Sequence, residues 1–179
     1  HHELCQILPG SPAQRAGILP GDLLTHIDGH PIRDVIDYQY FVVAGNPVLT
    51  VVRGGQTMKI RVRKREGEPL GVYFDTMLMD KTRTCANRCV FCFIDQMPPR
   101  LRETLYVKDD DWRMSMLTGN YVTLTNVSDA ELDRIVARQA SPLYISVHAA
   151  DPQVRAAMMQ NPNAARLMPK LDKLRAGGI

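Results

Sequence analysis

The sequence predicts an α/β protein made of two unlike halves, and three observations support that fold class. Up to residue 74 the chain is a succession of short apolar runs interrupted by Gly and Pro, which is typical of a small β-rich domain. After residue 120, strand-like runs alternate with helix-like runs, which indicates βα units and a parallel sheet or barrel. Three of the four cysteines lie close together between these regions. We therefore expect one domain over residues 1–76 and a second over residues 77–179.

Four short apolar runs in the N-terminal half are expected to form strands, at residues 5–8, 22–27, 48–52 and 58–62. A pair of glycines at residues 54–55 lies between the last two runs. Because glycine readily takes positive φ, this pair predicts a hairpin turn that joins the two strands.

Two strands and three helices are expected in the C-terminal half. Residues 121–125 and 143–147 are rich in β-branched and aromatic side chains, which favours strands. Residues 128–138 open with a capping-box pattern and then repeat apolar side chains at helical spacing. An Asp-Pro pair at residues 151–152 is typical of a helix start, and a last helix is expected over residues 163–176. Because two or three βα units do not close a barrel, we expect the chain to be a piece of a longer protein.

Composition and charge indicate an ordinary globular protein. The chain has 179 residues, of which 45% are hydrophobic and 23% are charged, with a formal net charge of +3. That charge neither requires nucleic acid as a partner nor excludes it. No apolar run approaches the roughly 18 residues of a membrane-spanning helix, so we expect no membrane partner. Clustered cysteines argue against a secreted disulfide framework, so we expect a cytoplasmic protein with a metal site.

The central motif is the C-x3-C-x2-C spacing of Cys85, Cys89 and Cys92. Three thiolates can bind three irons of a [4Fe–4S] cluster and leave the fourth iron open, whereas an electron-transfer cluster usually has four protein ligands. Structural zinc is the main alternative, but it needs four ligands, so that Cys5 or His148 would have to be recruited from far along the chain. A set of buried cysteines that bind nothing is the third interpretation.

With Phe91 directly before the third cysteine, the motif resembles the signature of the radical-SAM superfamily. The resemblance implies two cofactors, a [4Fe–4S] cluster and S-adenosylmethionine, whose amino and carboxylate groups chelate the open iron. It also implies reductive cleavage of S-adenosylmethionine to a 5′-deoxyadenosyl radical, which acts on a substrate that the sequence does not identify. The electron would come from a donor such as a flavodoxin or ferredoxin.

More of the chain resembles one bacterial family regarded as iron–sulfur oxidoreductases. The matching stretches are residues 89–98, 106–112, 118–126 and 141–148. Members of this family join a PDZ-like domain to a radical-SAM core and a C-terminal domain of unknown function. The resemblance implies that residues 1–76 are the PDZ-like domain and that residues 77–179 are the first βα units of a partial (β/α) radical-SAM barrel, truncated before its later strands.

Several side chains are candidates to join the cysteines, because the carboxyl ends of barrel strands face the reaction. Asn126 follows one expected strand, while Ser146 and His148 end the other and point to one face. By similarity to radical-SAM proteins, such groups contact the amino group or ribose of S-adenosylmethionine, although a lone His at a strand end is more often structural. Phe91 is expected to pack on the adenine or to shield the cluster. The acidic run 109–111 is either a solvated loop or part of the site.

The N-terminal half resembles the middle of a bacterial PDZ domain in residues 10–13, 16–22 and 27–31. In PDZ domains the backbone amides of a Gly-rich loop bind a peptide C-terminus, and the peptide adds to the sheet as a strand. Residues 70–74 resemble such a loop displaced to the end of the domain, which implies a circularly permuted PDZ-like fold with a peptide or protein partner. The alternative is that residues 66–71 are only an interdomain linker.

The sequence therefore predicts a radical-SAM [4Fe–4S] enzyme that reductively cleaves S-adenosylmethionine to act on an unidentified substrate. The alternative is a PDZ-like binding module with a structural metal site and no catalysis. A third hypothesis is a fragment that keeps the fold without activity.

Overall fold

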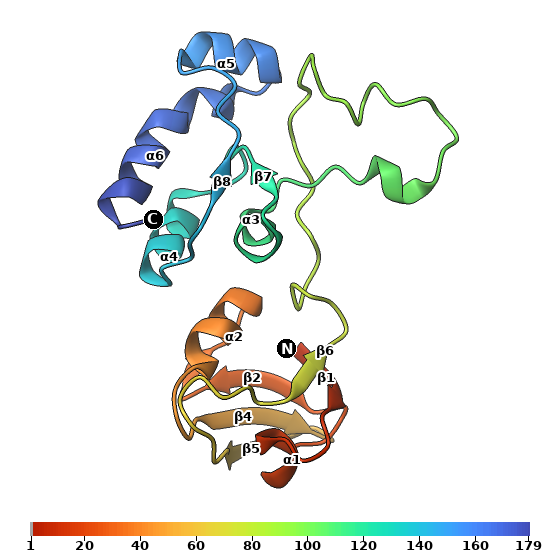
Figure 1. Ribbon diagram of the computed structural model, residues 1–179, viewed down its shortest axis with the longest axis vertical. Coiled ribbons are helices and arrows are strands. Elements are labelled where there is room, and N and C mark those ends of the chain that lie inside the picture. Colours follow the sequence, from red (N-terminus) through yellow and green to blue (C-terminus); the bar gives the residue numbers. More distant parts are fainter. Residues whose placement is uncertain (1) are drawn as a thin grey trace. The chain divides into compact units, whose positions relative to one another are not determined.

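The computed structural model describes residues 2–179 and divides into two compact units, one ending at Lys81 and the other spanning Thr82–Ile179 (Figure 1). The first unit is rich in β-strands and the second in helices. This mixture confirms the α/β fold class expected from the sequence. Among the described residues, no helix combines the length and the apolar character that crossing a membrane requires.

The first unit is built on an antiparallel sheet with the strand order β5-β4-β2-β1-β6. Its strands are β1 (His2–Ile7), β2 (Leu23–Ile27), β4 (Val48–Arg53), β5 (Gln56–Arg61) and β6 (Val72–Phe74), and the short β3 (His30–Pro31) pairs with β2. The expected hairpin joins β4 to β5, where Gly54 and Gly55 have φ of 54° and 81°. Two consecutive positive φ values are what a tight two-residue turn requires, and glycine adopts them without a steric clash.

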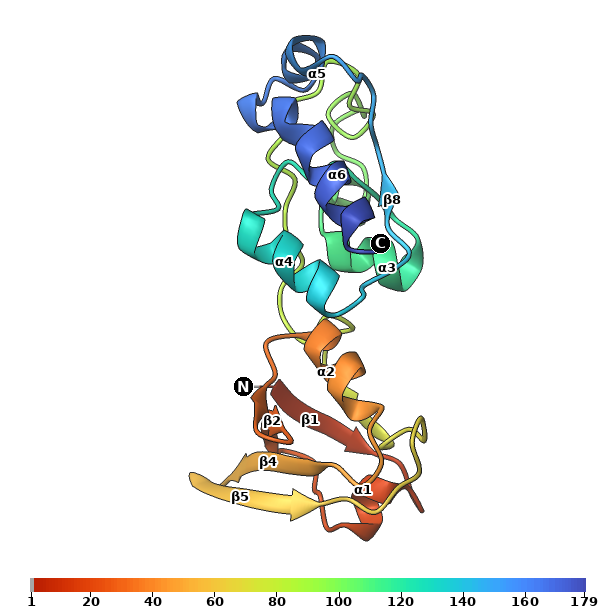
Figure 2. The ribbon, with the colours of Figure 1, turned by 90° about the vertical axis from the view of Figure 1, so that its left-hand side faces the viewer.

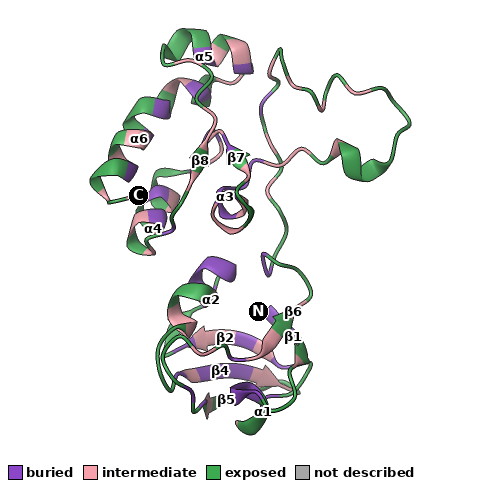
Figure 3. Cartoon of the chain, viewed as in Figure 1, coloured by how far each residue is buried: buried purple, intermediate pink, exposed green. Residues whose placement is uncertain are grey.

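Two short helices complete the first unit, α1 (Pro12–Arg15) and α2 (Val35–Val42). Each begins at a side chain that accepts a backbone hydrogen bond, Ser11 for α1 and Asp34 for α2. Helix α2 lies over one face of the sheet (Figure 2), and buried positions lie on β1, β2 and β4 and at the start of α2 (Figure 3). The core side chains with at most 1% exposure include Leu4, Leu24, Ile27, Leu49 and Val51.

Residues 72–74 form strand β6 of the sheet, and the two residues before it, Leu70 and Gly71, accept backbone hydrogen bonds from Ala13 and Leu8 of the same unit. Strand β6 pairs antiparallel with β1, and the carbonyl group of Gly71 accepts a hydrogen bond from the amide of Leu8 at 2.8 Å. Gly71 has a φ of 77°, and a Cβ atom there would lie 2.3 Å from the Cβ of Ser11, so only glycine fits. The last strand of the unit thus lies beside its first strand, and the circular permutation of the PDZ-like fold stays a prediction.

The second unit contains two short parallel strands with helices alongside. Strand β7 (Tyr121–Val122) pairs with β8 (Tyr144–Ile145), as expected for βα units. The helices are α3 (Trp112–Thr118), α4 (Asp129–Ala137), α5 (Pro152–Met159) and α6 (Leu167–Ala176), with 3-10 turns η1 (Glu103–Tyr106) and η2 (Pro162–Arg166). Helices α4 and α6 lie side by side in both views (Figures 1 and 2).

Both strands of the second unit are shorter than the runs that predicted them. After β7, the amide of Thr123 donates to the Asp110 carboxylate at 2.7 Å, and Leu124 takes a φ of 60°. After β8, His148 takes a φ of 63°. A ladder cannot continue through such left-handed backbone. The chain therefore leaves the sheet after each strand, and after β7 it does so at the buried Asp110, which the local sequence pattern does not indicate.

Helix starts in this unit follow the signals in the sequence. The Ser128 hydroxyl accepts from the amide of Glu131, and the Glu131 carboxylate accepts from the amide of Ser128, which is the expected capping box. Asp151 caps α5, with Pro152 as its first residue. The last expected helix begins earlier, as η2, and changes to α-helical geometry at α6.

Candidate functional site

A cavity of about 360 Å³ lies in the second unit, beside the ends of β7 and β8. Six of the seven side chains singled out in the sequence line it: Cys85, Cys89, Phe91, Cys92, Ser146 and His148. The structure therefore brings the cysteine segment and the end of β8 together on one surface, although they lie far apart in the chain.

The cysteine segment is held in place at both of its ends. The amide of Cys85 donates to the carbonyl group of Lys108 at 2.8 Å, next to a β-bridge between the flanking residues. Further along, the amides of Arg88 and Val90 donate to the last two carbonyl groups of α5, at 3.0 and 2.9 Å. The last carbonyl groups of a helix have no hydrogen-bond partner within that helix. The bonds that they accept here therefore fix the turn that carries Cys89.

The pKa values of two of the thiols, Cys85 and Cys89, are raised in the cavity. Burial raises the pKa of Cys89, and the neighbouring Cys85 and Cys92 raise it further because thiolates repel one another. Burial also raises the pKa of Cys85, and the nearby Asp110 carboxylate acts in the same direction. Within residues 2–179, no three His, Cys, Asp or Glu side chains form a ready-made site for a metal ion. Three thiolates so close together repel one another, so that nearby positive charge is needed to keep all three deprotonated. A bound metal centre supplies that charge.

Asn87 connects the first cysteine to the end of β7. Its side chain is 2% exposed, and its Nδ2 lies 3.4 Å from the Sγ of Cys85 and 3.1 Å from the Oγ1 of Thr123. The Thr123 hydroxyl in turn donates to the buried Asp110 carboxylate at 2.5 Å. Asn161, beyond the end of α5, donates to the Oδ1 of Asn87 at 2.7 Å. A continuous hydrogen-bonded chain therefore orients one thiol.

Lys108 places a cation against the same segment. Its Nζ donates to the Oδ2 of Asp95 at 2.6 Å and to the carbonyl group of Asn87 at 2.9 Å, and its side chain is 20% exposed. The hydrogen bond to Asp95 raises the pKa of Lys108, and attraction to the thiolates of Cys92 and Cys85 adds to the effect. The ammonium group is therefore charged at neutral pH.

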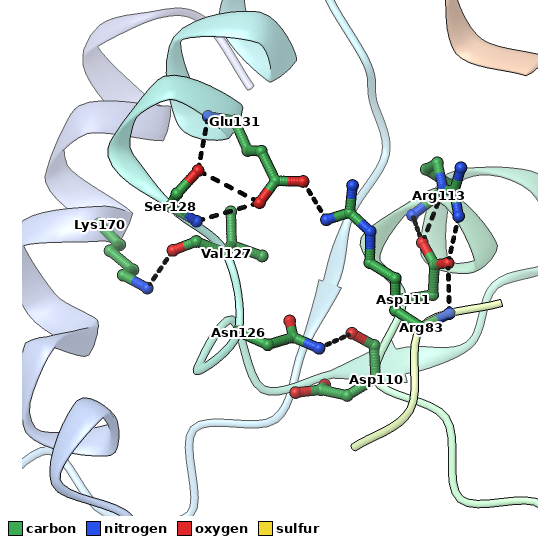
Figure 4. Close-up of polar contacts among 9 residues, drawn as sticks. All are labelled: Arg83, Asp110, Asp111, Arg113, Asn126, Val127, Ser128, Glu131 and Lys170. Atoms are coloured by element: carbon green, nitrogen blue, oxygen red, sulfur yellow. Dashed lines mark hydrogen bonds and ion pairs between the residues drawn. The ribbon is translucent and has the colours of Figure 1, made fainter. Parts of the chain in front are cut away.

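The three acidic side chains of residues 109–111 do not share one environment. Asp109 lines the cavity and accepts from the side chain of Asn120 at 3.3 Å, whereas Asp110 and Asp111 are buried. Burial alone would raise the pKa of Asp111, but its hydrogen bonds from Arg113 and from the amide of Arg83 hold it below its ordinary value (Figure 4). Two of the three acids thus order the backbone, and the run is not a solvated loop.

Asn126 lies outside the cysteine cavity. Its Nδ2 donates to the carbonyl group of Asp110 at 2.9 Å (Figure 4). It lines a separate polar hollow of about 250 Å³, which Lys170 also lines while donating to the carbonyl groups of Leu124 and Val127. A contact between Asn126 and S-adenosylmethionine stays a prediction.

An aromatic pair covers one side of the cavity. The rings of Phe91 and His148 lie 4.7 Å apart, and Phe91 is 39% exposed. Burial lowers the pKa of His148, and the charge of the neighbouring Arg155 lowers it further, so the imidazole is neutral at pH 7. A neutral imidazole can accept a hydrogen bond from a ligand or bind a metal ion.

Arg155 on α5 forms hydrogen bonds to the chain just after β7 and just after β8. This side chain is 1% exposed, and its guanidinium donates to four carbonyl groups at 2.6–3.1 Å. The acceptors are Thr123, Ser146, Val147 and Ala164. Because the Thr123 and Ser146 side chains line the cavity, Arg155 fixes the wall that faces the cysteines.

Sequence reasoning missed Asn87, Lys108 and Arg155. Asn87 lies within the cysteine motif and Lys108 adjoins the acidic run, so their positions were a usable signal. Arg155 gave none, because a single basic residue in an amphipathic helix ordinarily lies on the solvated face.

The fold and the site together define a two-part protein, in which a PDZ-like sheet unit precedes a βα unit with three cysteines on one cavity. Residues 64–179, well over half of the chain, match the family described as Radical SAM-like domain, and the chain belongs to that family. Residues 3–53 match the PDZ domain family, so both parts of the expected resemblance are confirmed. Serine protease HTRA3 from Homo sapiens is 38% identical over 50 residues, which are 28% of this chain and 11% of that relative. The chain thus spans only a small part of the relative's length.

Proposed function

We propose that Cys85, Cys89 and Cys92 hold a [4Fe–4S] cluster with one open iron, and that the protein reductively cleaves S-adenosylmethionine to act on an unidentified substrate. The observation that carries the proposal is that these three thiols line one cavity with Ser146 and His148. When bound, such a cluster supplies the electron that breaks the sulfonium bond of S-adenosylmethionine and yields a 5′-deoxyadenosyl radical.

The donor set supports a cluster with an open iron. Thiolates are the ordinary ligands of iron–sulfur clusters, and the second unit contains three cysteines and no fourth. Cys5, the remaining cysteine, lies on β1 of the first unit and is exposed. The fourth iron would therefore be left for the amino and carboxylate groups of S-adenosylmethionine.

Neighbouring side chains would orient S-adenosylmethionine and exclude water. The Ser146 hydroxyl and the neutral His148 imidazole offer hydrogen-bonding groups at the cavity wall. The Phe91 ring offers an apolar surface for the adenine or for the cluster. An electron donor such as a flavodoxin or ferredoxin would complete the reaction, and the reducing cytoplasm is the compartment we propose because all four cysteines are free thiols.

A zinc site is the competing function, and one observation favours it. His148 lines the same cavity as the cysteines, so a Cys3His ligand set lies within one part of the structure. In that case the metal would be structural, and the protein would be a binding module without catalysis.

Anaerobic reconstitution separates the two functions. With iron and sulfide we expect a brown protein with about four iron atoms per chain. After reduction with dithionite, the protein should release 5′-deoxyadenosine from S-adenosylmethionine. One tightly bound zinc ion with no release would contradict the proposal.

We also propose that the PDZ-like unit binds a peptide C-terminus along β6. Strand β6 is last in the strand order, and among residues 2–179 its one strand partner is β1. The rings of Tyr38 and Phe74 lie 5.0 Å apart, which places α2 beside this strand. An open strand edge next to a helix suits the addition of an extended peptide.

A random peptide library with free C-termini tests this binding. We expect enrichment of apolar C-terminal sequences from that library and none from a library blocked as C-terminal amides. Gly71→Val is expected to remove the enrichment, because its Cβ would overlap Ser11. Equal enrichment from both libraries would contradict a carboxylate-binding loop.

A further inference from the structure

We propose that Lys108 sets the reduction potential of the cluster, as a fixed positive charge whose effect Asp95 partly cancels. This inference rests on the proposed function, because it concerns a cluster held by Cys85, Cys89 and Cys92. Lys108 is not a ligand in this account. It is a positioning and charge-supplying residue that acts through the cysteine segment.

Lys108 contacts the cysteine segment through both its main chain and its side chain. Its carbonyl group accepts from the amide of Cys85 at 2.8 Å, and its Nζ donates to the carbonyl group of Asn87 at 2.9 Å. Asn87 lies between the first and second cysteines, and Lys108 itself lines the cavity. The ammonium group is therefore held against the cysteine segment by hydrogen bonds to Asn87 and Asp95 and does not extend freely into solvent.

Lys108 lines the same cavity as all three cysteines. Reduction adds one negative charge to the cluster, and a nearby cation stabilises the reduced form more than the oxidised form. Because the Lys108 side chain is only 20% exposed, water screens this interaction less than it would at an open surface.

Asp95 is placed to oppose that effect. Its carboxylate lies 2.6 Å from the Nζ of Lys108 and follows Cys92 by three residues. At 49% exposure Asp95 is better solvated than its partner, so it cancels the lysine charge in part. Removal of the lysine and removal of the aspartate should therefore shift the potential in opposite directions.

Opposite shifts separate an electrostatic role from a structural one. If the pair only held the segment in shape, breaking it from either side would disturb the cluster in the same way. Lys173 offers a matched control, since it forms an ion pair with Asp133 at 2.6 Å in the same unit and does not line the cavity.

The test is an anaerobic redox titration of the reconstituted full chain, followed by electron paramagnetic resonance of the reduced cluster. At the wild-type midpoint, we expect Lys108→Gln to lower the ratio of reduced to oxidised cluster about tenfold, which is about 59 mV for a one-electron couple. Asp95→Asn should raise that ratio. Lys108→Arg, which keeps the charge, and Lys173→Gln should leave it unchanged.

Two outcomes overturn the inference while the proposed function stands: both Lys108→Gln and Asp95→Asn shift the ratio in one direction, or neither shifts it. If Lys108→Gln fails to assemble a cluster, Asp95→Asn decides, because an unchanged or lowered ratio in that variant contradicts the inference. A wild-type chain that assembles no cluster overturns the proposed function itself, and the inference with it.

Discussion

Replacing Cys89 with alanine is expected to abolish assembly of the iron–sulfur cluster. Cys89 is the central cysteine of the motif and lies on a turn that is held by the last carbonyl groups of α5. Burial raises the pKa of its thiol, and the neighbouring Cys85 and Cys92 raise it further. Two thiols cannot hold three irons of a cluster, so the iron content should fall from about four per chain to near zero. Iron and sulfide analysis after anaerobic reconstitution measures this loss.

Cys5→Ala is the matched control for that experiment. Cys5 is exposed on β1 of the PDZ-like unit and does not line the cavity of the second unit. We expect this variant to keep its full iron content and its brown colour. Loss of the cluster in Cys5→Ala would show that the assignment of three ligands is wrong.

Replacing Arg155 with methionine is expected to destabilise the second unit by about 3 kcal/mol or more. Methionine keeps most of the volume but removes every donor, so four carbonyl groups lose a hydrogen bond inside the protein. Each unsatisfied buried polar group costs about 1–3 kcal/mol. The loss should also loosen the cavity wall formed by Thr123 and Ser146.

Urea unfolding followed by tryptophan fluorescence measures this effect within the second unit. The chain has one tryptophan, Trp112, which is fully buried on α3. Arg175→Met is the control, since the Arg175 side chain is 85% exposed and, among residues 2–179, forms an ion pair with Asp172 alone, so the change in unfolding free energy should stay within about 0.5 kcal/mol. Equal unfolding free energies for the two variants would refute the structural role of Arg155.

Local signals in the sequence predicted much of the fold. The hairpin at Gly54 and Gly55, the capping box at Ser128, and the helix start at Asp151 each depend on neighbouring residues, so they can be recognised without tertiary structure. The cysteine spacing likewise indicated the candidate site. The lengths of β7 and β8 were overestimated, because the turn after Thr123 is fixed by a carboxylate from another segment.

The long-range hydrogen bonds around the site could not be predicted for the same reason. Asn161 reaches Asn87 across 74 positions of the chain, and Arg155 reaches Thr123 across 32. Periodicity describes which face of an element is buried, but it does not specify which distant groups meet there. Asn126 illustrates this limit, since a strand-end position placed it with Ser146, whereas the structure gives it a separate hollow.

The central claim is that the three cysteines hold a cluster whose fourth iron is open to S-adenosylmethionine. Electron paramagnetic resonance of the reconstituted and reduced chain, recorded with and without S-adenosylmethionine, tests it most directly. We predict a cluster signal whose g-values change when S-adenosylmethionine is added, because its amino and carboxylate groups bind the open iron. A cluster signal that S-adenosylmethionine leaves unchanged, or a chain that retains one zinc ion and gives no cluster signal, would contradict the account.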